Sequence, residues 1–156
     1  MSGSISLRTA GLEDSETLRG WRNDALTMSM SKNDLNVTRT NHDLWMGSVI
    51  ADPYRHLLVA ERDRNAVGTV RFDVKDGVAE LSLTVAPTMR NQGLGNLILS
   101  LALEWAWEQL TVGLIAAEVK RTNRPSIKIF ERCGFSLAGN QDPLLYQLRR
   151  DKAMQG

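Results

Sequence analysis

A run of three consecutive strand patterns in the middle of the chain constrains the fold more than any other feature. The patterns cover residues 56–61, 67–74 and 78–85. A polar turn at 63–65 separates the first two, and Asp76-Gly77, a strong hairpin signal, separates the last two. The third pattern alternates strictly, with Glu80, Ser82 and Thr84 opposite four apolar residues. The three patterns together predict an antiparallel meander with one polar face.

The remaining patterns place helices and strands around this meander. Apolar side chains at helical spacing predict helices over 14–23, 40–50, 95–110 and 124–133. Short apolar runs predict strands over 5–10, 114–119, 135–138 and 144–148. No period is visible over 28–37, which we expect to be a loop. The order predicts one mixed α+β domain over residues 1–156, with a core of about 5–150 and a central sheet of about seven strands flanked by about four helices.

Composition and charge exclude several classes of protein. The hydrophobic fraction of 42% and the charged fraction of 24% are those of an ordinary globular domain. The sequence shows no apolar run of about 18 residues and no secretory signal pattern, and a net charge of +1 does not favour nucleic acid as a partner. Cys133, the single cysteine, excludes an internal disulfide and a cysteine-rich zinc site. We therefore expect a cytoplasmic protein with no nucleic-acid or membrane partner.

The segment 90–95, Arg-Asn-Gln-Gly-Leu-Gly, joins the third strand pattern to a long apolar helix pattern. Gly93 and Gly95 lack side chains, so a ligand can approach the backbone closely. The first N–H groups of a helix have no partner within it, and the helix dipole adds about half a positive charge there. The segment therefore predicts an anion site suited to a pyrophosphate, with Arg90 as a further charged contact. Neither a Walker loop nor the three-glycine dinucleotide motif is present.

Two motifs follow each other in the second half of the chain. The first is an Arg/Gln-x-x-Gly-x-Gly loop, here residues 90–95. The second is Asn-x-x-Ser/Ala followed by Tyr/Phe and Gly-Phe, carried here by Asn123, Ser126, Phe130, Gly134 and Phe135. With them the chain resembles the GNAT superfamily of N-acetyltransferases over nearly its full length. The resemblance implies a mostly antiparallel sheet whose strands 78–85 and 114–119 splay apart at a cofactor cleft, and transfer of an acetyl group from acetyl-coenzyme A to a primary amine.

The resemblance also implies which residues hold the cofactor. The backbone of 83–85 would pair with the extended pantetheine arm much as an added strand would. Asn123 would bond the pantetheine, and Phe130 would pack near the thioester sulfur. The full set expected to bind the cofactor is Leu83, Val85, Arg90, Asn91, Gln92, Gly93, Leu94, Gly95, Asn96, Asn123, Ser126 and Phe130. Acetyl-coenzyme A would be a co-substrate in direct transfer, and no metal is expected.

Transfer to an amine needs a base for the amine, a donor for the tetrahedral oxyanion and a proton source for the leaving thiolate. By family analogy the backbone N–H of Val85 would be the oxyanion donor. Many relatives have a tyrosine where this chain has Phe130, so Tyr146 or a water would donate the proton, unless the thiolate leaves unassisted. Glu80 and Glu118 lie on the polar sides of the two splayed strands, and either carboxylate or a water chain to it would serve as base, with Glu80 as our choice.

Two motifs in the first third of the chain concern the acceptor. Trp21-Arg22-Asn23 and His42-x-x-Trp45 resemble a branch of the superfamily that acetylates the 4-amino group of a UDP-linked deoxy sugar in the pseudaminic acid pathway. These five residues form the expected substrate-binding set, because Arg22 can fork onto a phosphate and tryptophan offers a flat apolar face. A protein N-terminal acetyltransferase, of the kind acting on ribosomal proteins, and a non-catalytic acyl-coenzyme A binding module stay as alternatives. We expect a monomer or a homodimer.

Overall fold

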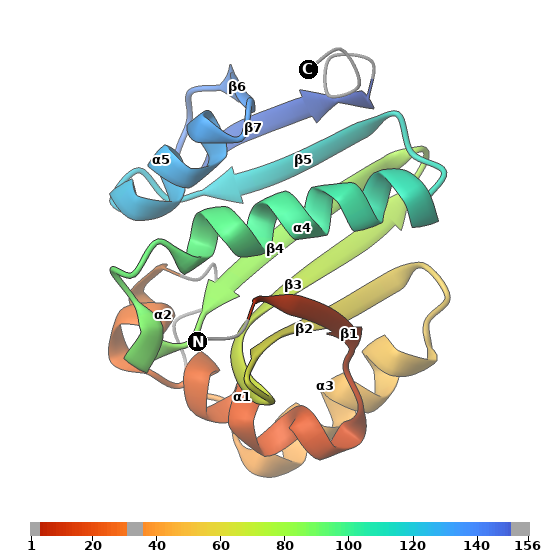
Figure 1. Ribbon diagram of the computed structural model, residues 1–156, viewed down its shortest axis with the longest axis vertical. Helices are drawn as coiled ribbons and strands as arrows, with labels where there is room; N and C mark the ends of the chain where they lie inside the picture. The colour runs from red at the N-terminus through yellow and green to blue at the C-terminus, as the bar shows by residue number, and fades with distance from the viewer. Residues whose placement is uncertain (1–3, 31–35, 151–156) are drawn as a thin grey trace.

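The computed structural model describes residues 4–30 and 36–150, and it confirms the predicted mixed α+β architecture (Figure 1). The strands are β1 (Ser6–Thr9), β2 (Arg55–Arg62), β3 (Asn65–Lys75), β4 (Val78–Val85), β5 (Leu114–Val119), β6 (Ser136–Gly139) and β7 (Leu144–Arg149). They form one seven-stranded sheet in the order β1-β2-β3-β4-β5-β7-β6. Every neighbouring pair is antiparallel except β4 and β5, which run parallel.

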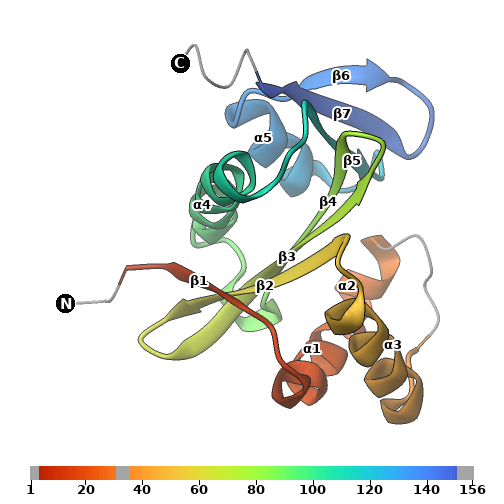
Figure 2. The ribbon, with the colours of Figure 1, turned by 90° about the vertical axis from the view of Figure 1, so that its right-hand side faces the viewer.

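Helices cover both faces of this sheet, and Figure 2 shows the two groups of helices on its opposite sides. The helices are α1 (Ser15–Arg22), α2 (Ala25–Met30), α3 (Arg39–Ala51), α4 (Leu94–Gln109) and α5 (Arg124–Arg132). The larger core lies between the sheet and the α4 and α5 side, where Phe72, Ile98 and Ile115 are fully buried. A smaller core on the opposite face packs Met46 and Val49 of α3 against the sheet.

The strict alternation of β4 decides what each face receives. Ala79 and Leu81 are buried in the core under α4, whereas Glu80 and Ser82 are exposed on the face toward α1–α3. The Asp76-Gly77 hairpin, as predicted, connects β3 to β4. The polar face of the meander therefore looks into the space that α1–α3 border.

The parallel pairing of β4 with β5 is short. It covers only Val78 with Leu114, Ala79 with Ile115 and Glu80 with Ala116. Beyond these pairs β4 stays with β3 as far as Val85, and β5 stays with β7 as far as Val119. The sheet therefore splays open between β4 and β5 beyond Glu80.

One prediction about the fold is wrong. Residues 28–30, expected in a loop, belong to the helix α2, whereas 31–35 lie outside the described residues and 36–38 are coil. The helix begins after Asp24, whose Oδ2 accepts a hydrogen bond from the backbone N–H of Thr27 at 3.1 Å. A capping carboxylate of this kind satisfies one of the N–H groups left without a partner at a helix start.

Candidate active site

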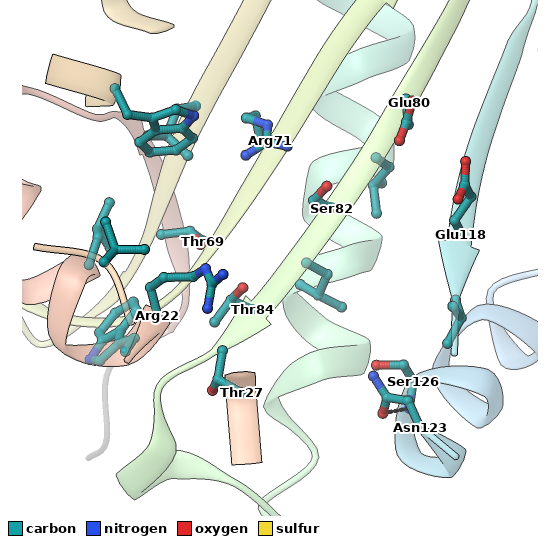
Figure 3. Close-up of a pocket in the computed structure, with 18 of the residues that line it drawn as sticks. Arg22, Thr27, Thr69, Arg71, Glu80, Ser82, Thr84, Glu118, Asn123 and Ser126 are labelled. Carbon is teal, nitrogen blue, oxygen red and sulfur yellow. Dashed lines mark hydrogen bonds between the residues drawn. The ribbon is translucent and has the colours of Figure 1, made fainter. Parts of the chain in front are cut away.

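A pocket of about 540 Å³ lies where the sheet splays, between α1–α3 on one side and β4, β5 and α5 on the other (Figure 3). We call it the cleft pocket. Many side chains that border it come from the residues singled out in the sequence: Trp21, Arg22, His42, Trp45, Glu80, Leu83, Glu118, Asn123, Ser126 and Phe130. The structure thus brings residues from the first third of the chain together with the strand and helix motifs of the second half.

The floor of the cleft pocket also contains Thr69 and Arg71, two polar residues that were not predicted from the sequence. Thr69 of β3 lies opposite Thr84 of β4, and Arg71 lies opposite Ser82. Arg71 is held in place because its Nε donates to Asp73 Oδ2 at 3.1 Å and its guanidinium lies 5.4 Å from the centre of the Trp45 ring. The alternation of β3, counted from the Asp76-Gly77 turn, would have placed Thr69 and Arg71 on this face.

The β3–β4 hydrogen bonds determine which backbone groups of β4 point into the gap. Ala86 N donates to Val67 O at 2.8 Å, just past the end of the β3–β4 ladder. Hydrogen-bonded and non-hydrogen-bonded pairs alternate in an antiparallel ladder, so every second residue of β4 turns its N–H and C=O away from β3. These residues are Leu81, Leu83 and Val85, since the ladder runs to Val85 without a register shift. An extended amide chain placed in the gap would meet donors and acceptors along this edge.

The segment 90–95 leads directly into α4, as the sequence predicts. Gly93 precedes the helix with a φ of 74°, a left-handed conformation that glycine adopts without strain, and Asn91 also has a positive φ of 64°. A side chain at Gly93 would meet open space, whereas one at Gly95 would collide with Ile129 of α5. Gly93 therefore leaves the backbone open to a ligand, whereas the absence of a side chain at Gly95 lets Ile129 of α5 pack against the start of α4.

The first turn of α4 holds a buried acceptor atom as well as free backbone N–H groups. Asn96 lies in the first turn, and its Oδ1 is buried without a hydrogen-bond partner among residues 4–30 and 36–150. The N–H groups of a first turn point out of the helix and attract anions. These N–H groups fit a pyrophosphate, whereas the Asn96 oxygen only accepts hydrogen bonds and would need a donor from the ligand or from water. Segment 90–96 does not border the cleft pocket itself.

Arg90 also has partners within the protein. Its Nη2 donates to Asp24 Oδ2 and to Thr27 Oγ1, both at 2.7 Å, so it joins the loop before α4 to α2. The guanidinium holds the pKa of the Asp24 carboxyl below its usual range. On the other side of the gap, Lys120 Nζ donates to the backbone oxygen of Ser29 at 3.0 Å. Helix α2 is thus attached to both sides of the splayed sheet.

The second motif places Asn123, Ser126 and Phe130 against the cleft pocket. The Asn123 side chain accepts from the backbone N–H of Ser126 and caps α5, as Figure 3 shows. Phe130 is buried and lies edge-to-face with Phe135. Tyr146 does not border the cleft pocket: its ring stacks on Phe130, and its hydroxyl donates to Glu131 Oε2 at 3.3 Å. The structure therefore gives the expected proton-donor role of Tyr146 no support.

Four of the five residues in the acceptor motifs border the cleft pocket, and one does not. Trp21, Arg22, His42 and Trp45 border the cleft pocket, but Asn23 does not. The Asn23 side chain donates to Val37 O at 2.8 Å and accepts from Val37 N at 2.7 Å. Asn23 therefore acts on the pocket indirectly, because it holds the backbone of Val37, which is a pocket residue.

An open gap between β4 and β5, a strand edge of amide groups beside it and a glycine-led helix start together define an acyltransferase that uses a coenzyme A thioester. The family model described as acetyltransferase (GNAT) domain matches residues 4–136. The chain belongs to the GNAT acetyltransferase family and is an N-acetyltransferase with acetyl-coenzyme A as co-substrate.

Individual relatives agree with this assignment. An L-amino acid N-acetyltransferase, AaaT, of Escherichia coli (strain K12) is 27% identical over 112 residues, which are 69% of this chain and 69% of that protein. A spermidine N-acetyltransferase from Vibrio cholerae, in complex with CoA and spermine, superposes with a TM-score of 0.87 at 18% identity, covering 97% of this chain and 98% of that one. The aminoglycoside acetyltransferase AAC(6')-Ib in complex with coenzyme A gives 0.85 at 19%, with the same coverage.

Two further observations concern the described residues only. None of their helices has the length and apolar character needed to cross a membrane. Nor do three or more histidine, cysteine or acidic side chains gather in a way that could hold a metal ion within residues 4–30 and 36–150.

Proposed function

We propose that the chain acetylates the primary amine of a small acceptor that also carries an anionic group, and that this acceptor is a nucleotide-linked amino sugar. The observation that carries the proposal is the distribution of charge around the cleft pocket. Arg22 and Arg71 enter from α1 and β3, whereas Glu80 and Glu118 enter from the two splayed strands, as Figure 3 shows. Opposite charges on the two sides suit an acceptor with an ammonium group at one end and an anion at the other.

The arginine side of the cleft pocket also offers aromatic surface. Trp21 and Trp45 border it, and the Arg71 guanidinium lies over the Trp45 ring. Arginine can bind a phosphate with two parallel hydrogen bonds, and a tryptophan ring packs against a sugar or a base. Both features support a sugar nucleotide over a peptide. A volume of about 540 Å³ is also in the range of pockets for ligands of drug size.

The residues of this chain would act on the reaction in three ways. Gly93 and the first turn of α4 would hold the pyrophosphate of acetyl-coenzyme A, whose thioester supplies the acetyl group. The β4 edge at Leu83 and Val85 would bind the pantetheine amides, and the Val85 N–H would donate to the oxyanion. The Glu80 carboxylate would attract the acceptor ammonium, whose proton a base must take before the nitrogen can attack.

An L-amino acid is the second candidate acceptor. A relative that is 27% identical is named an L-amino acid N-acetyltransferase. An amino acid also carries an ammonium and an anion, so the same arginines would bind its carboxylate. The acceptors named for the two solved structures, an aminoglycoside and spermine, carry only positive charge, and arginines in the pocket disfavour them.

The test is turnover by the Arg22→Ala and Arg71→Ala variants with three acceptors: a UDP-linked 4-amino sugar, a set of L-amino acids and short peptides. With the sugar nucleotide, kcat/KM should fall about 10- to 100-fold in either variant, because a charged hydrogen bond is lost. Affinity for acetyl-coenzyme A should stay unchanged. Arg132→Ala, at the exposed end of α5, is the matched control.

Three outcomes separate the candidates. Sugar-nucleotide turnover that depends on Arg22 or Arg71 supports the proposal. Turnover of amino acids alone, with the same dependence, replaces the sugar nucleotide by the second candidate. Activity on peptides alone, indifferent to both arginines, refutes an anionic small-molecule acceptor.

A further inference from the structure

A hydrogen-bonded chain of three side chains crosses the packing between α1 and α3. Ser15 Oγ donates to Asp43 Oδ1 at 2.6 Å and lies 2.7 Å from His42 Nδ1. The hydroxyl has a single hydrogen, and a carboxylate only accepts hydrogen bonds, so this hydrogen belongs to the bond with Asp43. His42 Nδ1 must then be the donor to Ser15.

The tautomer follows from this bond. A neutral imidazole with hydrogen on Nδ1 has its lone pair on Nε2. His42 is only 4% exposed, yet it borders the cleft pocket. Among the residues that the structure describes, no hydrogen-bond partner of Nε2 is found. Because Ser15 occupies Nδ1, Nε2 is the ring atom left to accept a proton, and the residue that carries it borders the cleft pocket.

The other end of the chain reaches the opposite surface. Ser15 and Asp43 border an outer groove between α1 and α3, and the Asp43 side chain is 51% exposed. The three groups therefore connect the cleft pocket with solvent outside it. Acetylation of an ammonium group releases one proton, and hydrogen-bonded groups between the cleft pocket and solvent can help this proton to leave.

We propose that His42 is the base that takes the proton of the acceptor, with Ser15 and Asp43 as positioning residues that fix its tautomer. This inference rests on the proposed transfer of an acetyl group to an amine. The acceptor ammonium loses one proton to Nε2, and its nitrogen forms the bond to the acetyl carbon. The carbon–sulfur bond breaks, and the second proton of the nitrogen leaves with the thiolate as the thiol. The imidazolium then returns its proton to water, so Glu80 and Glu118 need only attract the ammonium.

The charges around the ring set the expected pH dependence. Burial lowers the pKa of His42 below its ordinary value of 6.5, and Arg19 and Arg22 of α1 act in the same direction. Glu16 of α1 and Asp43 of α3 oppose them. The ring is therefore neutral at pH 7, and kcat should fall only as the pH drops through this lowered pKa.

The experiment has two readouts on the full chain. The first is the nitrogen NMR spectrum, in which only His42 and His56 carry imidazoles and the His56→Gln variant assigns the signals. We expect hydrogen on Nδ1 of His42. The second is the pH dependence of kcat with the UDP-linked 4-amino sugar and with L-amino acids. His42→Gln should lower kcat about 100-fold with little change in KM and remove the acid limb.

The positioning residues have their own variants. Ser15→Ala should lower kcat about 10-fold, and Ser15→Thr should restore it because the hydroxyl returns. Asp43→Asn should move the acid limb to lower pH, since a charge that raises the His42 pKa is removed. Asp76→Asn on the exposed β3–β4 turn is the matched control.

Two results would overturn the assignment. One is hydrogen on Nε2 of His42, which would leave that atom without a lone pair to accept the proton. The other is a His42→Gln variant that keeps both kcat and the acid limb. The tautomer is measured without an acceptor, so it tests the His42 assignment alone. A wild-type protein that acetylates none of the acceptors would instead refute the proposed function.

Discussion

Arg90 and Asp24 are 66 residues apart in the sequence and meet in an ion pair of 2.7 Å between Nη2 and Oδ2. The pair connects the loop that begins the anion site to the short helix α2. Both side chains are partly buried, at 27% and 28% exposure. The loop before α4 therefore depends on a residue from the first part of the chain for its position.

Loss of this ion pair should weaken cofactor binding. We expect Asp24→Asn to lower affinity for acetyl-coenzyme A about 2- to 3-fold and Arg90→Ala about 10-fold, because the second change also removes the predicted phosphate contact. Both effects should shrink at high salt. Calorimetry at two salt concentrations measures them. A fall for Arg90→Ala no larger than that for Asp24→Asn would show that Arg90 acts through α2 alone, and unchanged affinity in both variants would contradict the prediction.

Gly93 can be tested with a single methyl group. Gly93→Ala places a side chain at a φ of 74°, which L residues rarely adopt, so the turn should shift and affinity for acetyl-coenzyme A should fall. Gly20→Ala, in α1 with open space around it, is the matched control and should stabilise the protein by about 0.5–1 kcal/mol. Calorimetry and thermal unfolding read the two effects separately. Equal affinity in both variants would move the anion site elsewhere.

The missing hydroxyl at Phe130 gives a paired prediction. Phe130→Tyr should keep or raise kcat, since the ring borders the cleft pocket and a phenol can protonate a leaving thiolate. Tyr146→Phe should change kcat less than about 2-fold, because its hydroxyl bonds to Glu131 outside the pocket. Burial raises the pKa of Tyr146, and removal of that hydroxyl should leave the pH–rate profile unaltered. A lost basic limb in Tyr146→Phe would restore Tyr146 as the proton donor.

The Arg8–Asp14 ion pair links β1 to the start of α1. Two hydrogen bonds of 2.8 and 2.7 Å join the guanidinium to the carboxylate, which also accepts from Gly11 N at 2.9 Å. Asp14→Asn should lower the free energy of unfolding by about 1–3 kcal/mol at pH 7. Urea unfolding measures this, with Asp76→Asn as the control expected within about 0.5 kcal/mol.

The pH dependence of the same pair has a defined sign. Arg8 lowers the pKa of Asp14 in the folded state. The contribution is therefore complete above the ordinary value of about 3.9 and is lost as the pH falls through the folded-state value. The difference between wild type and Asp14→Asn should stay constant from pH 7 to pH 5 and shrink in stronger acid. A difference that shrinks above pH 5 would contradict the sign.

Much of the fold could be predicted because its signals are local. Strict alternation and the Asp76-Gly77 turn predicted the β3–β4 hairpin, and the same turn would have placed Arg71 opposite Ser82 had the register been extended. Helix α2 could not be predicted in this way. It has only six residues, and its contacts come from Arg90 and Lys120, which lie far away in the sequence.

Contacts between distant residues also limit how much of the site could be predicted from the sequence. Asn123, Ser126 and Phe130 all border the pocket, because α5 and its N-cap carry them within two turns of helix. Spacing does not reveal what a side chain contacts in space. Asn23 lies beside Arg22 in the chain but bonds to Val37, and Tyr146 lies on the expected strand but turns its hydroxyl to Glu131.

The two halves of the sheet share a hydrophobic core, but the ladder between β4 and β5 has only three residue pairs. A bound pantetheine arm would supply amide hydrogen bonds to the β4 edge where the ladder to β5 has ended. Cofactor binding would therefore stabilise the folded sheet. A ligand that binds only the folded state adds about 2.7 kcal/mol to stability at a concentration 100 times its dissociation constant. The heat tolerance of this enzyme is therefore coupled to the coenzyme A supply of the cell, and its melting temperature should rise with each increase in ligand concentration.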